Sequence, residues 1–109
     1  MTSQTLSLGE TIARRLRACR RERGLTQAQV TVRCVQTGSA EPTQYAIGQI
    51  ERGERRDITV RELLALALAL DITPADLLAD GHTVQVTDTV TVTPAQMRAW
   101  LAGEALPAA

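Results

Sequence analysis

YAIGQIERGERR, residues 45–56, is the stretch that determines the fold we predict for this 109-residue chain. Thr43 can cap a helix over residues 44–52, because a threonine side chain there accepts a hydrogen bond from a free amide of the first turn. Gly53 ends that helix. One face of it is apolar and carries Ala46, Ile47 and Ile50. The opposite edge carries Gln44, Tyr45, Gly48 and Gln49, so this edge is free to contact a partner.

Two helices are predicted before this one. The first has an apolar stripe at helical spacing, formed by Leu8, Ile12, Leu16 and Cys19. Gly24 ends it, because glycine adopts the left-handed cap conformation without a Cβ clash. Thr26 and Gln29 form a capping box that opens the second helix. Val30 and Cys34 form the inward face of that helix.

Two more helices are predicted after it. Thr59 and Glu62 form another capping box, and a long apolar stripe follows. Thr73 caps a short fifth helix with Pro74 at its first position, where the missing N–H of proline is not needed. These patterns predict a compact, mainly α domain.

The last part of the chain has a different pattern. TVQVTDTVTVT, residues 83–93, alternates strictly and is rich in β-branched residues, which is typical of a strand. One long strand and a hairpin about Asp88 both fit, since the midpoint lacks the Asn-Gly or Asp-Gly signal of a tight hairpin. A final helix begins at Thr93-Pro94. We therefore predict a flexible N-terminus (1–7), a five-helix domain (8–81) and a C-terminal extension (82–109).

The charged residues are divided unevenly along the chain. Residues 10–61 hold eleven arginines against six acids, whereas residues 62–109 hold one arginine, Arg98, against six acids. A basic half favours a polyanionic partner. Arginine can bind phosphates or guanine edges through two parallel hydrogen bonds. The use of arginine without lysine is equally explained by codon usage in a GC-rich genome.

Several function classes are excluded by what the sequence lacks. No apolar run is long enough to span a membrane, and there is no signal-peptide pattern, so we expect a cytoplasmic protein. Cys19, Cys34 and His82 are too few for a four-ligand metal site made of cysteine and histidine. We expect both cysteines in the core. With no recognisable catalytic set, we expect no metal, no cofactor and no enzyme activity.

Together these elements resemble the Cro/C1-type helix-turn-helix family, also called XRE-like, which includes phage repressors. The resemblance covers about two-thirds of the chain and rests on RRERGLTQAQV (20–30), YAIGQIERGERR (45–56), TVRELLALALALDIT (59–73) and PADLL (74–78). It implies a five-helix, lambda-repressor-like DNA-binding domain whose third helix lies in the major groove. Double-stranded DNA is then the expected partner.

The resemblance also implies which residues bind DNA. Gln44 and Gln49 are expected to read bases, since glutamine can bond adenine through two hydrogen bonds, the alternative being that they are only solvated. Tyr45 would pack on a thymine methyl or bond a phosphate, and Gly48 would let the helix approach the DNA closely. Gln27 would contact a phosphate and brace Gln44. The remaining candidates are Thr43 and, for phosphate contact, Arg52, Arg55 and Arg56.

The other charged residues near this site are expected to have structural roles. Glu51 is the expected partner of an arginine, with one on the first helix as the leading candidate. Of the arginines around that helix, one or two are expected to face DNA, and the rest to be solvated or paired: Arg14, Arg15, Arg17, Arg20, Arg21 and Arg23.

One feature departs from the family pattern. Eight residues, Val35–Pro42, separate Cys34 from Thr43, whereas the turn in this motif has about 3–4 residues. Either the second helix runs longer or a loop is inserted between the two DNA-binding helices. Such a loop would be either an extra contact at the edge of the DNA or a neutral surface insertion.

A valine-faced strand pair is not stable alone in water, so the C-terminal extension must pack on the helical domain or on a second copy of the chain. We expect it to complete a homodimer, because family members commonly bind palindromes as twofold dimers. The candidate contact residues are Val84, Val86, Val90, Val92, Met97, Trp100 and Leu101. The leading function is a sequence-specific transcriptional regulator, in particular a repressor. The alternatives are an antitoxin-like protein whose C-terminal region binds a protein partner, and a protein-interaction module without DNA binding.

Overall fold

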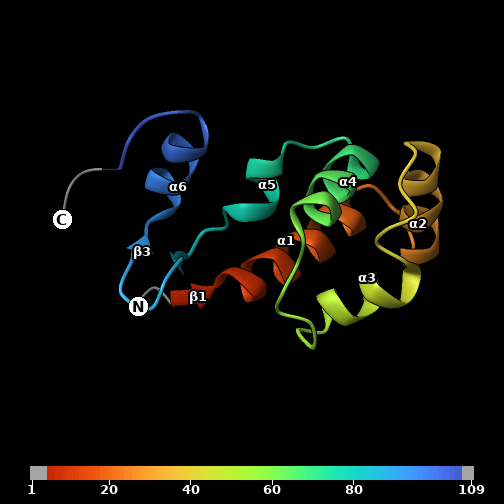
Figure 1. The fold of residues 1–109 in the computed structure, drawn as a ribbon, viewed down its shortest axis with the longest axis horizontal. Helices are drawn as coiled ribbons and strands as arrows, with labels where there is room; N and C mark the ends of the chain where they lie inside the picture. The colour runs from red at the N-terminus through yellow and green to blue at the C-terminus, as the bar shows by residue number, and fades with distance from the viewer. Residues whose placement is uncertain (1–4, 107–109) are drawn as a thin grey trace.

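The computed structural model describes residues 5–106, which form six helices and three short strands. In chain order they are β1 (Thr5–Ser7), α1 (Leu8–Glu22), α2 (Gln27–Gln36), α3 (Gln44–Glu51), α4 (Val60–Leu70), α5 (Pro74–Leu78), β2 (Thr83–Gln85), β3 (Thr91–Val92) and α6 (Pro94–Leu101). In Figure 1, α1 runs through the middle of the molecule, with α2, α3 and α4 at one end and the small sheet and α6 at the other. The predicted mainly α fold, with five helices before a β segment and a final helix, is confirmed. None of the helices within the described residues is long and apolar enough to cross a membrane.

Each helix begins at a hydroxyl side chain that caps it. The predicted capping boxes of Thr26 with Gln29 and of Thr59 with Glu62 are present. Three further boxes begin helices at Ser7, Thr73 and Thr93. Gly24 follows α1 at φ 65°, the left-handed conformation predicted for it. Local hydrogen bonding therefore sets where the helices begin and end.

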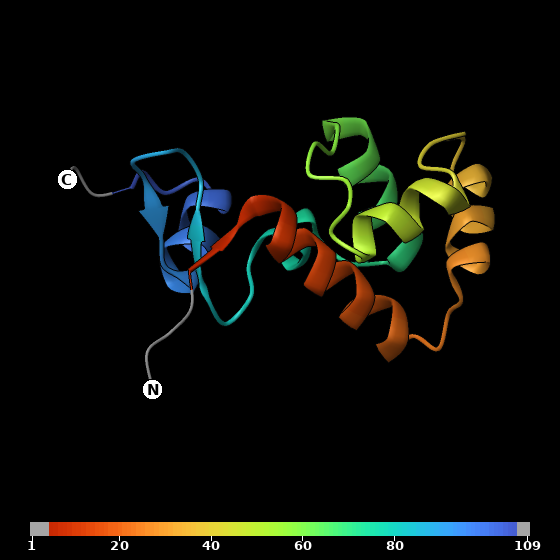
Figure 2. The same cartoon turned by 90° about the horizontal axis from the view of Figure 1, so that it is seen from below.

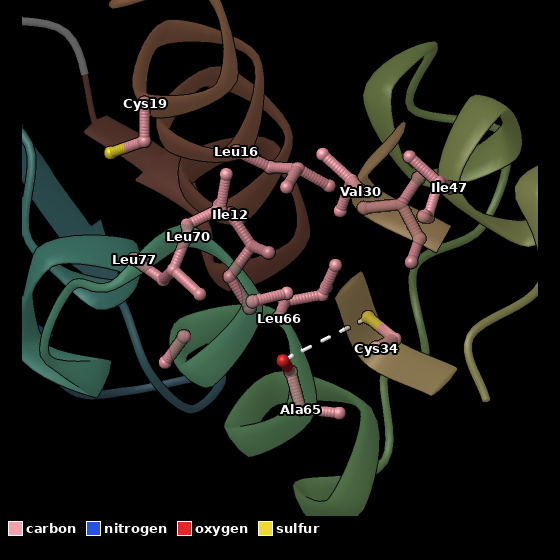
Figure 3. Packing of buried hydrophobic residues seen from close by; sticks show 13 residues of the cluster. Ile12, Leu16, Cys19, Val30, Cys34, Ile47, Ala65, Leu66, Leu70 and Leu77 are labelled. Carbon is pink, nitrogen blue, oxygen red and sulfur yellow. Dashed lines mark hydrogen bonds between the residues drawn. The ribbon is translucent and has the colours of Figure 1, made fainter. Parts of the chain in front are cut away.

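One large core lies between α1, α2, α3, α4 and α5. In Figure 3, Leu16 of α1, Val30 of α2 and Ile47 of α3 point toward one another, and all three are fully buried. Cys19 and Cys34 belong to the same cluster, as predicted, and burial raises the pKa of both thiols. This core fixes the orientation of α2 and α3.

A second, smaller core joins the C-terminal extension to the start of α1. β1 pairs in parallel with β2, and β2 pairs antiparallel with β3. Leu6, Val84 and Val92 are aligned across the three strands and buried, and Met97 of α6 packs in the same cluster as the two valines. Because β1 continues directly into α1, this sheet ties the extension to the helical domain (Figure 2).

One prediction about these segments is wrong, and one choice between two alternatives is decided. Residues 1–7 are not all loose, because Thr5–Ser7 pairs with β2; residues 1–4 lie outside the described residues. Residues 83–93 form a hairpin, one of the two alternatives that fitted the sequence, in which Val84 and Val92 are paired and buried. Val90 is 42% exposed, because the chain reverses between Val86 and Val90, where the Val86 amide donates to the Val90 carbonyl at 2.9 Å. The alternation in the sequence continues through the turn, but the strands do not.

The insertion between the second and third helices consists of both helix and loop. α2 extends to Gln36, and a loop follows as far as the α3 cap. The Ser39 amide donates to the Cys34 carbonyl at 3.0 Å, so the loop folds back on the end of α2. The loop then runs beside α4, where residues 37–41 and the outer face of that helix line a groove of about 760 Å³. The insertion therefore lies against α4.

Candidate nucleic-acid interface

The outer edge of α3 is open, as predicted. Ile47 and Ile50 are fully buried and attach the helix to the core. On the opposite side Tyr45 is 72% exposed, Gln44 is exposed and Gln49 is partly exposed. Figure 1 shows α3 along one edge of the helical domain, far from α6 and the small sheet. Neither the inserted loop nor residues 82–106 of the C-terminal extension cover this edge.

Five of the nine predicted DNA-binding residues line one hollow. It has a volume of about 440 Å³, lies between the beginning of α2 and the outer edge of α3, and is lined by Gln27, Gln44, Tyr45, Gly48 and Arg52. Gln27 is far in sequence from the other four residues, and the packing of α2 against α3 brings them together. The other four candidates, Thr43, Gln49, Arg55 and Arg56, lie outside this hollow.

Gly48 is not exposed, contrary to the prediction. The Arg52 side chain folds back over it, so that a Cβ added at Gly48 would lie 2.9 Å from Arg52 Nη1 and 3.4 Å from Gln27 Oε1. The expected role of leaving the helix backbone open to DNA therefore does not hold. Glycine at this position makes room for the guanidinium of Arg52.

Arg52 is held by Glu54, which was not among the predicted site residues. Arg52 Nε and Nη2 donate to the two carboxylate oxygens of Glu54, both at 3.1 Å. This hydrogen bonding raises the pKa of Arg52 and lowers the pKa of Glu54, although both side chains are half exposed. Only the spacing of the two residues in ERGE could have indicated the pair.

α3 is also attached to α1 through a buried ion pair, and the predicted structural role of Glu51 is confirmed. Arg20 Nε and Nη2 donate to Glu51 Oε2 and Oε1 at 2.7 and 2.8 Å, and the Glu51 side chain is 2% exposed. Gln27 Nε2 donates to Glu51 Oε1 at 3.2 Å. Burial alone would raise the pKa of Glu51, but the hydrogen bonds from Arg20 and Gln27 outweigh it and lower that pKa. One carboxylate thus joins α1, α2 and α3.

Arg55 and Arg56 have different surroundings, although both were predicted to contact phosphate. Arg55 donates to both carboxylate oxygens of Glu62, whose side chain is 4% exposed. Arg55 is therefore engaged in anchoring the connection between α3 and α4. Arg56 is exposed beside Gly9 in the first turn of α1, and within residues 5–106 no hydrogen bond or ion pair engages its side chain. Of the two, Arg56 is the one whose guanidinium is open to solvent.

Most arginines around α1 bind the protein itself. Arg14 pairs with Asp80 at 3.0 Å, and Arg20 with Glu51. Arg15 and Arg23 donate to the backbone carbonyls of Asp76 and Asp71. Among these six arginines, Arg17 and Arg21 are the two whose side chains make no hydrogen bond or ion pair within the described part of the chain, and both are exposed. Four of the six arginines are thus paired, and two remain open to solvent, which leaves the expectation that one or two of the group face DNA as a prediction.

The seven predicted dimer-contact residues do not form one surface. Val84, Val92 and Met97 are buried in the small core and cannot meet a second chain, so the prediction is wrong for these three. Val86 is partly buried. The other three are each 42% exposed: Val90, Trp100 and Leu101. A strand that packs on its own helix has no free apolar face left for a partner.

The helical domain is similar to two solved structures. A solved structure of the restriction-modification controller protein C.AhdI from Aeromonas hydrophila is 30% identical, with a TM-score of 0.54; the match covers 63% of this chain and 94% of that chain. An HTH_3 family transcriptional regulator from Vibrio cholerae is 26% identical, with a TM-score of 0.56; the match covers 64% of this chain and 35% of that longer chain. No protein-family model matches the sequence, and no curated protein matches it. The likeness to the controller protein thus extends over nearly its whole length, in sequence as well as fold.

Proposed function

The chain belongs to the Cro/C1-type helix-turn-helix family, and from this membership we propose that it is a repressor that binds a palindromic operator as a homodimer. Its structural neighbours are transcriptional regulators and not enzymes. In this proposal double-stranded DNA is the ligand, and α3 enters its major groove.

The open polar edge of α3 is the observation that carries the proposal. A helix that reads bases needs a rigid attachment and side chains that reach outward. Ile47, Ile50 and Glu51 supply the attachment. Gln44 and Tyr45 supply the reach, at the end of the helix that enters the groove.

Individual roles follow from the surroundings of each side chain. Gln44 and Gln49 read base edges, since a glutamine amide pairs with adenine N6 and N7. Tyr45 contacts a thymine methyl or a phosphate. The exposed Arg56 contacts the DNA backbone, and Thr43 and Gln27 lie at the starts of helices, where backbone amides favour a phosphate.

The charge distribution supports the same ligand. The eleven arginines of residues 10–61 outnumber the six acids of that segment. A surface that neutralises several phosphates releases condensed counterions, so its affinity for DNA falls steeply as salt rises. A protein-interaction module without DNA binding would not show this salt-dependent affinity for DNA.

A second copy of the chain would supply the second recognition helix of a palindrome. We place the contact on α4, where Val60, Leu64 and Leu68 form a stripe at a spacing of four residues and are 71%, 44% and 67% exposed. The stripe borders the groove beside the inserted loop, in which Glu41 and Arg61 lie on opposite walls. In a twofold interface, Glu41 of one copy can meet Arg61 of the other, and Arg61 of the first copy can meet Glu41 of the second. These opposite charges therefore suit self-association. Val90, Trp100 and Leu101 remain as exposed apolar side chains of the C-terminal extension.

Selection of bound sequences from random duplex DNA tests the proposal. We expect the full chain to enrich one motif with twofold symmetry, and the mass of the complex to correspond to two chains per duplex. Enrichment of no sequence, together with binding that does not weaken between about 50 and 200 mM salt, would refute it.

A further inference from the structure

The position of the Arg52 guanidinium points to a role beyond a phosphate contact. Arg52 caps the end of α3, but its side chain returns over Gly48, one turn earlier, and lines the hollow that Gln44 and Tyr45 also line. It therefore presents its charge beside the side chains that would face bases. An arginine that served only the DNA backbone would have no need to lie over the middle of the helix.

Glu54 fixes which edge of the guanidinium is available. An arginine side chain has five N–H donors. The two bonds to Glu54 use Nε and one hydrogen of Nη2, so Nη1 and the other hydrogen of Nη2 are left along the terminal edge. Two parallel donors match the O6 and N7 acceptors of guanine in the major groove.

Gly48 is the second requirement for this arrangement. Its missing Cβ leaves the space that Arg52 Nη1 occupies, since a Cβ there would lie only 2.9 Å from that nitrogen. Any larger residue at position 48 would displace the guanidinium from the helix surface. Gln27 Oε1 lies on the other side of the same space, 3.4 Å from that Cβ position.

Glu54 places a negative charge at the proposed DNA-binding surface, and this charge indicates a role in specificity. A carboxylate beside a polyanion weakens binding to every sequence, and an isolated phosphate contact needs no fixed orientation. A carboxylate that orients an arginine lowers general affinity but raises discrimination between bases. We propose that Arg52 reads a guanine of the operator, with Glu54 as its positioning residue and Gly48 as the clearance that allows it.

This inference rests on the proposed function, and its test compares the motifs that variants select from random duplex DNA. The wild-type chain should select a motif with a guanine in each half-site. Arg52→Ala should lose the preference at that position by roughly 5- to 150-fold and keep the other positions. Glu54→Gln should weaken the preference for guanine at the same position of the motif, while the affinity of this variant for random DNA increases. Replacing that guanine by 7-deazaguanine should weaken the wild-type chain and leave Arg52→Ala unaffected.

Two controls separate the outcomes. Arg98→Ala removes another half-exposed arginine with a carboxylate neighbour, on α6, and should leave the motif and the affinity unchanged. If Arg52→Ala keeps the wild-type motif and weakens all sequences alike, Arg52 is a phosphate contact and the inference is wrong. If Glu54→Gln tightens all sequences equally without blurring a position, Glu54 does not position Arg52. A wild-type chain that enriches no motif overturns the proposed function itself, which is a different result from either.

Discussion

Arg20 of α1 donates through Nε and Nη2 to the two carboxylate oxygens of Glu51 of α3, at 2.7 and 2.8 Å, in a pair that is almost completely buried. Gln27 of α2 donates to the same carboxylate. The Glu51 carboxylate therefore joins α1 to both of the helices that would meet DNA, α2 and α3. The orientation of the recognition helix depends on this charge as well as on the apolar core.

Breaking that pair should destabilise the fold. Arg20→Met leaves Glu51 buried without its cation, and we expect a loss of roughly 3 kcal/mol in the free energy of unfolding, measured by urea denaturation. Adding Glu51→Leu should recover much of the loss, because it removes the unpaired charge. A double variant as unstable as the sum of both single variants would contradict this role.

Acid should weaken the fold through the same groups. The folded-state pKa values of Glu51 and Glu62 lie below the ordinary value of 4.5, so their carboxylates add stability that is fully present above that pH. This stability is lost as pH falls below about 4.5 and through the lowered pKa values. Thermal melts between pH 7 and pH 3 should show the loss, with a shallower dependence in Glu51→Gln. An equally steep dependence in that variant would show that Glu51 is not involved.

Gly48→Ala should separate stability from specificity. Alanine is the better helix former by roughly 0.5–1 kcal/mol, and the group it would contact is the movable end of Arg52. We expect a slightly more stable protein whose preference for guanine is reduced as in Arg52→Ala. A destabilised Gly48→Ala, or one with an unchanged motif, would argue against the packing of Arg52 over α3.

Base-reading and backbone-binding residues should respond differently to substitution. Gln44→Ala and Gln49→Ala should relax the sequence preference and leave weak non-specific binding intact. Arg56→Ala should weaken binding to all sequences and reduce the slope of log affinity against log salt by about 1. Arg55→Ala should lower stability, because it leaves Glu62 buried and unpaired. Competition binding at several salt concentrations, with a melting curve for each variant, checks all four.

The proposed dimer contact is tested by a charge in the apolar stripe. Leu64→Glu should make the chain monomeric in sedimentation equilibrium and weaken operator binding, since each copy would then bind alone. Trp100→Glu, on the C-terminal extension, should remain dimeric. A dimeric Leu64→Glu and a monomeric Trp100→Glu would place the contact on the C-terminal extension instead.

The features predicted correctly from the sequence are local ones. Capping pairs such as Thr26 with Gln29 lie three residues apart, and the apolar spacing of Ile47 and Ile50 is set by one helix, so neither depends on the rest of the fold. The role of Glu51 was also predictable, because an acid on the inner side of a helix needs a cation. These signals located α1 to α5 and the open edge of α3.

The features that were missed depend on contacts distant in sequence or on side-chain conformation. The pairing of β1 with β2 joins residues almost eighty positions apart, and a three-residue strand has no periodicity of its own. The cover of Gly48 by Arg52 depends on the rotamer that Glu54 stabilises. The burial of Val84, Val92 and Met97 follows from α6 packing on the sheet, and an alternating pattern alone does not say which partner covers its apolar face.

Mapping backbone amide shifts by NMR during titration with the selected duplex tests the central claim, that the outer edge of α3 meets DNA, most directly. We expect the largest shifts at Gln27 and over residues 43–52, with little change at β3 and α6. Large shifts confined to the C-terminal extension or to the inserted loop, with α3 unchanged, would contradict it.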